Sequence, residues 1–314
     1  MSLGVCCQWL EPYTKRDGSI EYINSINERT LQLGRFKAGA YPLSLIRDVY
    51  HNNVQEILRV IPKLVANNIR SFRLSSGLFS LFEFNSGMIK DDEVLIRLLQ
   101  QAGAAFVSGG IRVTTHPGQF TVLSSDNKDT VSNAVLELTN HAWVFDTMGF
   151  PQTPYAAINI HGGKRDRLAQ LVDGIHSLPD NTRNRLTLEN DESCYSLLDL
   201  LPVYEATGVP VCWDSHHHTF NDAGMGLEDA CGLAAYTWQK FGCKPLQHLS
   251  NTTIGMEDGN FTERRKHSRY IHMIPDCQRD GLINDVIDVD VEAKAKNLAV
   301  LELSRKLFPA DKLS

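Results

Sequence analysis

Short apolar segments alternate with amphipathic ones along most of the 314 residues, and this alternation restricts the possible folds more than any single motif. Eight apolar segments resemble β-strands, and they span residues 3–7, 69–74, 111–115, 155–160, 186–188, 209–213, 246–250 and 286–291. Helical periodicity marks residues 43–67, 92–103, 128–148, 167–178, 195–207, 227–241 and 293–307. Strands that alternate with helices pair in parallel, and eight such units close into a barrel. The sequence therefore predicts the α/β class, as a single (β/α)8 TIM barrel with residues 1–314 as one domain.

Several segments are expected to depart from this regular pattern. Pro62 should kink or divide the first helix, and Gly103 should end the second. The polar segment after the first strand is long enough to be a functional loop, and a loop rich in Ser, Gly and Phe follows the second strand.

The composition excludes several classes of protein. No segment approaches the apolar length of a membrane span, and the N-terminus lacks the pattern of a signal peptide. The seven cysteines are odd in number and form no C-x-x-C pair, which indicates reduced thiols in a cytoplasmic protein. A net charge of −6 argues against a protein that coats DNA in general, although it allows a local DNA site.

Six consecutive predicted strands end in, or carry, a side chain that can bind a metal ion. These residues are His116, His161, Glu189, Asp214 with His217, His248 and Glu292, and a loop adds His267. In a parallel barrel the C-terminal strand ends meet on one face, where active sites form. A strand with an interior of Ile, Leu and Val has no packing reason to end in an imidazole or carboxylate. We therefore expect one cluster on this face.

The cluster holds too many donors for one ion. Five imidazoles and three carboxylates exceed the roughly four ligands of a zinc-like site, so we expect two or three divalent ions. Glu189 is central in strand order and is the expected bridge. Nitrogen and oxygen ligands without thiolate favour Mn²⁺, with Zn²⁺, Co²⁺ or Mg²⁺ as alternatives. His216 could replace His217, because alternation lets at most two of residues 216–218 face the ions. No site role is assigned to the histidines at 51, 141, 176 and 272.

Such a cluster favours hydrolysis of a phosphodiester. One ion can make hydroxide from water while the others stabilise the phosphate oxygens and the leaving group. Basic clusters at residues 15–16, 164–167 and 264–266 include two that adjoin candidate ligands. The third strand leads into His116-Pro117-Gly118, a turn that presents Gln119 and Phe120 together.

Nearly the whole chain resembles the ultraviolet damage endonucleases, relatives of the barrel-shaped apurinic endonucleases. The shared motifs are Leu3-Gly4, Arg29-Thr30-Leu31, Asn53, Phe72-Arg73, His116-Pro117-Gly118-Gln119, Ile158-Asn159-Ile160-His161, Thr187-Leu188-Glu189-Asn190-Asp191, Val209-Pro210 with Asp214, His248-Leu249-Ser250, His267 and Val291-Glu292-Ala293-Lys294. The order and spacing of these motifs make the resemblance specific.

The resemblance implies a role for each candidate residue. One metal would be held by His116, His161 and Glu189, a second by Glu189, Asp214, His248 and Glu292, and a third with the help of His217 and His267. Glu189, His217 and His267 would be the catalytic residues. The family nicks damaged double-stranded DNA immediately 5′ to the lesion and leaves a 3′-hydroxyl and a 5′-phosphate. Gln119 and Phe120 would probe the lesion by stacking in the weakened duplex. Lys164, Arg264, Arg265 and Lys266 would contact phosphates.

The chain departs from the family pattern at four places. Phe120 and Val5 stand where the family has tyrosine, and residues 78–85 lack a histidine that the family carries. Leu246 replaces a lysine that is carboxylated in characterised members. Lys244 shares that strand face but lies about 7 Å further from the loop. These differences concern the third metal and the range of lesions, and they leave the two-metal core intact.

Two other functions fit parts of the sequence. A sugar isomerase or epimerase can use the same barrel, because a fold does not determine a function. It needs only one or two metals, which leaves several ligands and the Gln119-Phe120 pair unexplained. A non-catalytic homologue that binds damaged DNA would explain the missing lysine and histidine. No protein partner and no membrane are implied.

Overall fold

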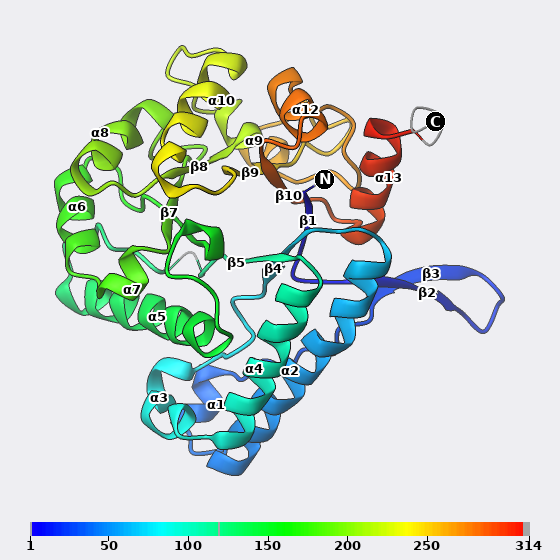
Figure 1. Ribbon diagram of the computed structural model, residues 1–314, viewed down its shortest axis with the longest axis vertical. Coiled ribbons are helices and arrows are strands. Elements are labelled where there is room, and N and C mark those ends of the chain that lie inside the picture. Colours follow the sequence, from blue (N-terminus) through cyan, green and yellow to red (C-terminus); the bar gives the residue numbers. More distant parts are fainter. Residues whose placement is uncertain (1, 119, 310–314) are drawn as a thin grey trace.

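Eight parallel strands close into a barrel in the computed structural model, which describes residues 2–118 and 120–309 (Figure 1). The barrel strands are β1 (Leu3–Cys6), β4 (Ser71–Leu74), β5 (Arg112–Thr115), β6 (Ile158–His161), β7 (Leu186–Glu189), β8 (Val211–Asp214), β9 (Leu246–Leu249) and β10 (Asp288–Val291). They pair in the order β1, β10, β9, β8, β7, β6, β5 and β4, and β4 pairs with β1 again. The predicted (β/α)8 barrel is confirmed, and each predicted strand overlaps an observed one.

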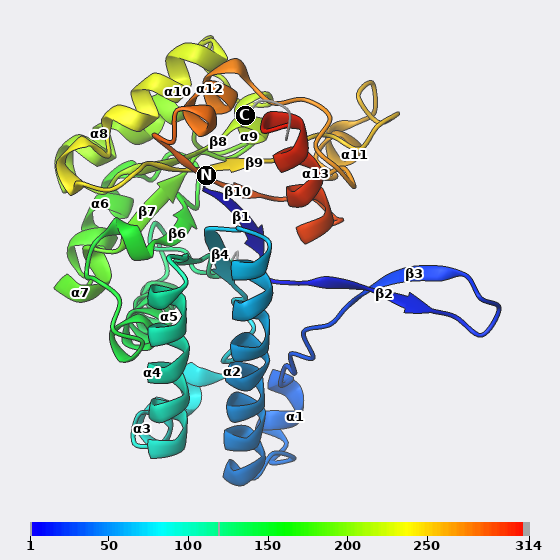
Figure 2. The ribbon, with the colours of Figure 1, turned by 45° about the vertical axis from the view of Figure 1, so that its right-hand side comes forward.

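Helices surround the barrel, as Figures 1 and 2 show. The helices between barrel strands are α2 (Leu43–Ala66), α3 (Phe82–Lys90), α4 (Glu93–Ser108), α5 (Lys128–Thr147), α6 (Leu168–His176), α7 (Asp180–Arg183), α8 (Leu197–Thr207), α9 (Ser215–His218), α10 (Leu227–Tyr236), α11 (Phe261–Arg264) and α12 (Asp276–Ile283). The last helix is α13 (Asn297–Leu307), and 3₁₀ turns occupy η1 (Pro154–Ala156) and η2 (Gln239–Phe241). The predicted helix at 227–241 is thus shorter and followed by η2, and the one at 293–307 starts later, at Asn297.

Of the two alternatives expected at Pro62, division of the helix is absent. α2 continues through Pro62, which is exposed, while Ile61 and Leu64 are buried and hold the helix against the core. The expected helix end at Gly103 is wrong. Gly103 does not end α4, which continues to Ser108. A Cβ at Gly103 would lie 1.9 Å from the Met148 carbonyl oxygen, so this glycine allows α4 to pack closely against the end of α5.

Two segments predicted as loops contain regular structure. The polar segment after β1 forms the antiparallel hairpin of β2 (Leu10–Thr14) and β3 (Ile20–Asn24), followed by the short helix α1 (Leu33–Lys37). The hairpin projects away from the barrel in Figures 1 and 2. None of its side chains is buried, so the sequence of these strands lacks the apolar alternation that marks a half-buried strand. The segment after β4 contains α3.

Polar side chains meet in the middle of the barrel interior. Asp290 on β10 accepts hydrogen bonds from Ser71 Oγ at 2.7 Å and Thr114 Oγ1 at 3.0 Å, and both donors stand on strands that do not adjoin β10. Such contacts can form only across the interior. The apolar residues of the strands, such as Val113 and Leu188, instead belong to the core beneath the helices. Gly4 makes room for Asp290, because a Cβ there would lie 2.0 Å from Asp290 Oδ1.

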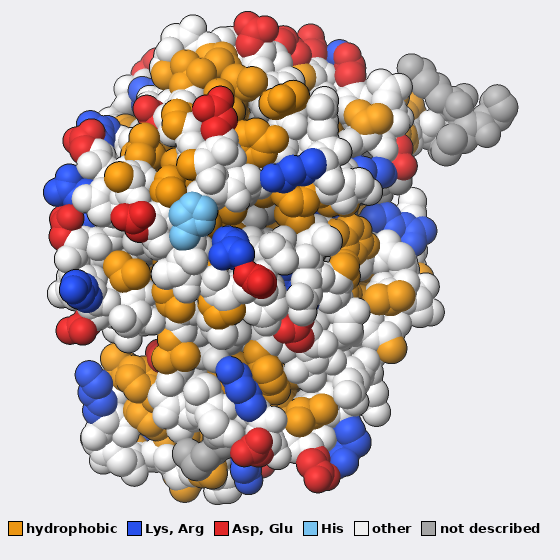
Figure 3. Space-filling view, turned by 60° about the vertical axis from the view of Figure 1, so that its left-hand side comes forward, with side chains coloured by type: hydrophobic (Ala, Val, Ile, Leu, Met, Phe, Trp, Pro, Cys, Tyr) orange, Lys and Arg blue, Asp and Glu red, His pale blue; other side chains and the backbone are white. Residues whose placement is uncertain are grey.

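Charged side chains of both signs are interspersed on the face of the molecule shown in Figure 3. Neither sign of charge dominates the side chains that Figure 3 shows on this face. All seven cysteines are free thiols, as expected for a reduced protein. Among the described helices, none combines the length and the hydropathy of a membrane span.

Candidate metal centre

The C-terminal ends of the strands bring the predicted ligands together. His161 and Glu189 end β6 and β7 and are paired in register, and Asp214 at the end of β8 is paired with His248 on β9. His116 follows β5 directly, and Glu292 follows β10. Residues separated by two positions along a strand point to the same face, so Thr187 and Glu189 both face the interior. The predicted cluster at the barrel mouth is therefore present as an arrangement of side chains.

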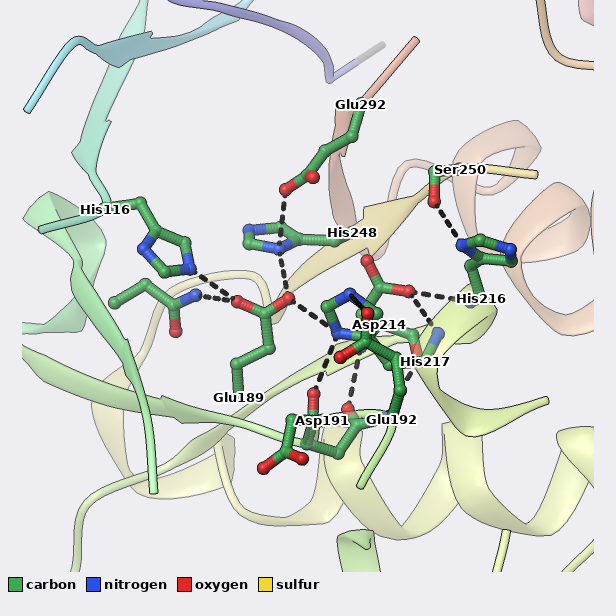
Figure 4. Close-up of polar contacts among 12 residues, drawn as sticks. His116, Glu189, Asp191, Glu192, Asp214, His216, His217, His248, Ser250 and Glu292 are labelled. Atoms are coloured by element: carbon green, nitrogen blue, oxygen red, sulfur yellow. Dashed lines mark hydrogen bonds and ion pairs between the residues drawn. The ribbon is translucent and has the colours of Figure 1, made fainter. Parts of the chain in front are cut away.

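Glu189 stands at the centre of the cluster, between His116, His217 and His248 in Figure 4. Its Oε2 atom lies 3.0 Å from His116 Nε2. Its Oε1 atom lies 3.0 Å from His248 Nδ1 and 3.3 Å from His217 Nδ1. The two carboxylate oxygens thus face opposite sides of the cluster, which is the arrangement that a bridging ligand requires.

Two groups of donors lie within reach of a metal ion. Within the described part of the chain, ligand atoms lie within 4.8 Å of one another in each group. One group is His116, His161 and Glu189, and the other is Glu189, Asp214, His248 and Glu292. His161 Nδ1 and Asp214 Oδ2 are buried and have no hydrogen-bond partner among the described residues. Each group thus contains a buried ligand atom without a hydrogen-bond partner, and all of its ligand atoms are nitrogen or oxygen. Both features fit a divalent cation.

Two carboxylates of the cluster, Glu189 and Glu292, have lowered pKa values despite their burial. Burial alone would raise the pKa of Glu189, but His248 and His161 hold it well below its usual range. Burial likewise opposes the ionisation of Glu292, whose pKa is lowered by Arg73 and His248. Burial lowers the pKa of His161, which favours the neutral imidazole that a metal needs. The cluster therefore offers anionic oxygens and a neutral ring nitrogen near neutral pH.

His217 and His267 lie in the same cleft, where the described residues form no third group of ligand atoms with them. His217 Nε2 is 3.6 Å from Glu192 Oε1, and His267 Nδ1 is 3.7 Å from Glu292 Oε2. His216 turns away from Glu189, because its ring nitrogens lie 3.0 Å from the hydroxyls of Ser250 and Thr252. The geometry thus places His217, rather than His216, beside the cluster (Figure 4).

The residue that replaces the family lysine is part of the apolar packing. Leu246 is fully buried against Ala157, Cys212 and Trp238. Lys244 pairs with Asp285 at 2.6 Å and lines a different cavity, together with Arg112. Position 246 therefore offers no lysine to the cluster, and Lys244 lies at a different cavity.

Three residues that the sequence interpretation left without a role support the ligands. Arg73 Nη2 donates to Glu292 Oε1 at 2.6 Å and lies 3.2 Å from His248 Nε2. Asn159 Nδ2 donates to Glu189 Oε2 at 2.5 Å, and Thr187 Oγ1 donates to Asn159 Oδ1 at 2.7 Å. The sequence did carry a signal for two of them. Arg73 is the next-to-last residue of β4, and Asn159 stands two positions before His161, on the same face of β6.

Glu192 is a further residue that the sequence interpretation missed. It accepts a hydrogen bond from Arg265 Nε at 2.7 Å, and His217 and Asp191 are its neighbours in Figure 4. Its position directly after the Glu-Asn-Asp run at the end of β7 was the available signal. Arg265 reaches the cleft through this contact.

The predicted DNA-binding residues are distributed around the barrel mouth. Arg265 and Lys266 line a cleft of about 610 Å³ together with His116, Glu189 and His267. The adjoining hollow includes Lys164, whereas Arg264 stacks on Phe220 with its guanidinium carbon 4.9 Å from the ring centre. Phe120 is 81% exposed. Gln119 lies outside the described residues.

Known proteins resemble this chain in sequence and in fold. The family described as UV-endonuclease UvdE matches residues 19–314. A UV DNA damage endonuclease from Deinococcus radiodurans is 37% identical over 285 residues, which are 88% of this chain and 89% of that protein. A UV DNA damage endonuclease from a Nostoc species is 32% identical over 83% of this chain and 79% of its own length. The crystal structure of SacUVDE matches 98% of this chain and 99% of its own, with a TM-score of 0.79 at 24% identity.

Proposed function

Because the chain belongs to the UV-endonuclease UvdE family, we propose that it is a metal-dependent DNA repair endonuclease acting on ultraviolet-damaged duplex DNA. The proposed reaction is one nick immediately 5′ to an ultraviolet photoproduct or another helix-distorting lesion. It leaves a 3′-hydroxyl and a 5′-phosphate. We propose further that residues 1–314 work as one domain and that the enzyme acts in the cytoplasm, where its chromosomal substrate would lie.

The observation that carries this proposal is the position of Glu189 between two donor groups. A carboxylate with one oxygen towards each group suits two ions that act on the same phosphate. We propose His116, His161 and Glu189 as ligands of the first ion, and Glu189, Asp214, His248 and Glu292 as ligands of the second. A third ion would use His217 and His267. Mn²⁺ is the proposed metal, with Zn²⁺, Co²⁺ and Mg²⁺ as alternatives.

Bound divalent ions would supply activation of water and positive charge for the phosphate oxygens. The chain's own residues would prepare and hold the substrate. Asn159 and Arg73 orient Glu189 and Glu292 through hydrogen bonds. Glu189, His217 and His267 are the proposed catalytic residues, and His217 and His267 border the cleft where protons would be exchanged with solvent.

DNA would be held by charge and by stacking. Arg265 and Lys266 line the cleft, and Lys164 extends the positive charge along the adjoining hollow. With Arg264 they would contact phosphates without reading sequence, so binding should weaken as the salt concentration rises. Gln119 and Phe120 would enter a weakened base stack, and the exposure of the Phe120 ring supports this role.

An incision assay tests the proposal. An end-labelled duplex with one ultraviolet photoproduct is incubated with the protein and Mn²⁺, beside undamaged and abasic duplexes. We expect a single nick just 5′ to the photoproduct. Cutting of the abasic duplex alone would identify an apurinic endonuclease instead. Absence of cutting by a protein that contains its metals would favour a damage-binding protein or a sugar isomerase.

A further inference from the structure

The turn that carries Phe120 is fixed at both ends. His116 begins the turn and is held by its contact with Glu189. At the other end, the Thr121 N–H donates to the Gly118 carbonyl at 3.0 Å, and the Thr121 side chain is buried with 5% exposure. Phe120 therefore extends into solvent from a short segment between a metal-ligand candidate and a buried threonine.

Glu137 on α5 holds the second end of this turn. The Thr121 hydroxyl donates to Glu137 Oε2 at 2.6 Å, and the Gly118 N–H also donates to this carboxylate. Burial and the neighbouring Glu83 raise the pKa of Glu137, although the two hydrogen bonds oppose this shift. A partly buried carboxylate thus depends on the turn for its partners, and the turn depends on the carboxylate.

Packing does not replace these two hydrogen bonds. Glu137 lines a cavity of about 180 Å³ between α3 and α5, which Phe79, Asn140 and His141 also line. Glu137 therefore borders open space on this side rather than packed side chains. Loss of the hydrogen bonds would leave Gly118 and Thr121 free to move towards this cavity.

We propose that Glu137 is a positioning residue, which fixes the turn that presents Phe120 to DNA and thereby sets the preference for distorted over intact duplex. The anchoring of Gly118 and Thr121 itself follows from their contacts with Glu137. Its effect on the choice of DNA rests on the proposed endonuclease function. A ring that is held in place can enter a base stack that a lesion has weakened with little loss of conformational entropy. A ring on a mobile turn loses more conformational entropy when it inserts, so it binds the distorted duplex less tightly.

The first experiment measures the turn without DNA. Hydrogen exchange of a peptide that spans residues 114–124 is followed in the wild type, Thr121→Val, Thr121→Ser, Glu137→Ala and Glu205→Ala. We expect Thr121→Val and Glu137→Ala to exchange about tenfold faster, the factor typical of losing a hydrogen bond to a charged group. Thr121→Ser keeps the hydroxyl and should behave as the wild type. Glu205 is exposed on α8, so its variant controls for loss of charge.

Unchanged exchange in both variants would overturn the proposal, whether or not the protein cuts DNA. This result separates a failure of the positioning role from a failure of the endonuclease function. Exchange that is equally fast in Thr121→Ser would also overturn it, because packing of the threonine methyl would then be the cause.

The second experiment measures the choice of DNA. Incision of a duplex with one photoproduct is compared with incision of the same lesion inside an unpaired bubble, where no stack has to be opened. We expect Thr121→Val and Glu137→Ala to raise KM on the duplex about fivefold to tenfold, the effect of weaker stacking on one base. Incision of the bubble and metal content should not change. Equal losses on both substrates would contradict the positioning role.

Discussion

Glu189 is nearly inaccessible to solvent, yet four side chains approach its two oxygens. A buried carboxylate is stable only when charge or hydrogen bonds compensate for lost water. His116, His217 and His248 provide that compensation here, and Asn159 fixes the orientation of one oxygen. Glu189 is therefore both a buried carboxylate that its neighbours stabilise and a proposed metal ligand. Two predictions concern these contacts.

Glu189→Gln should abolish nicking while the barrel remains folded. The amide keeps the size of the side chain but loses the charge and one acceptor oxygen, so the side chain can no longer serve both donor groups. Incision rates, bound metal per chain and the far-UV circular dichroism spectrum are measured on the same sample. Glu205→Gln serves as the control for a lost charge. A Glu189→Gln protein that still nicks DNA would show that this carboxylate is not a ligand.

Asn159→Ala should weaken metal binding without removing a ligand. Glu189 Oε2 and the Thr187 hydroxyl would each lose a partner inside the barrel. Losses of this kind lower metal affinity by roughly 10–100-fold. Titration of the apo protein with Mn²⁺ measures the change, and Asn133→Ala on the exposed face of α5 is the matched control. Equal affinity in wild type and Asn159→Ala would contradict an orienting role for Asn159.

At the scale of elements, Asp92 links α4 to α2. Its Oδ1 atom accepts from the N–H groups of Val94 and Leu95 at 3.0 Å, and Oδ2 lies 3.0 Å from His51 Nε2. Burial raises the pKa of Asp92, but these hydrogen bonds and His51 outweigh it, so the pKa lies below its ordinary value. The ionised cap therefore stabilises the fold above the unfolded pKa of aspartate.

Asp92→Ala should lower the free energy of unfolding by about 1 kcal/mol at neutral pH, as loss of an N-cap usually does. A lowered folded-state pKa means that this stabilisation is lost as the pH falls through that pKa. The difference between wild type and variant should therefore shrink in acid. Urea unfolding at neutral and acidic pH measures it, with Asp91→Ala as the control. A difference that grows towards acid would contradict this cap.

The barrel elements could be predicted from sequence because each strand carries apolar residues on the face beneath the helices, as Val113 and Leu188 do, and amphipathic helices separate the strands. Elements without a buried pattern, such as the exposed hairpin β2–β3, could not. Gly103 resembled a helix end because its partner, the Met148 carbonyl, is distant in sequence. The same limit applies to the site. Strand-end residues such as His161 follow from local alternation, whereas the contact of Arg73 with Glu292 depends on barrel closure.

At the scale of the whole molecule, the barrel brings residues from distant parts of the chain to one mouth. His116 and Glu292 belong to the same cleft, although 175 residues lie between them (117–291). An ion bound to such donors favours the closed barrel over the unfolded chain, where the donors are separated. The strength of that preference is set by the metal concentration relative to its dissociation constant.

Removal of metal should therefore lower the Tm of the whole barrel. A free metal concentration of about 100 times the dissociation constant stabilises by roughly 2.7 kcal/mol, which corresponds to a Tm shift on the order of 5 °C for a chain of this size. Calorimetry with chelator, and then with Mn²⁺ restored, measures the shift, while elemental analysis counts two or three ions per chain. Glu189→Gln should show little dependence on Mn²⁺, because both groups share that ligand. A wild-type Tm that stays constant while the metal is lost would show that the clustered donors do not hold ions in the folded state.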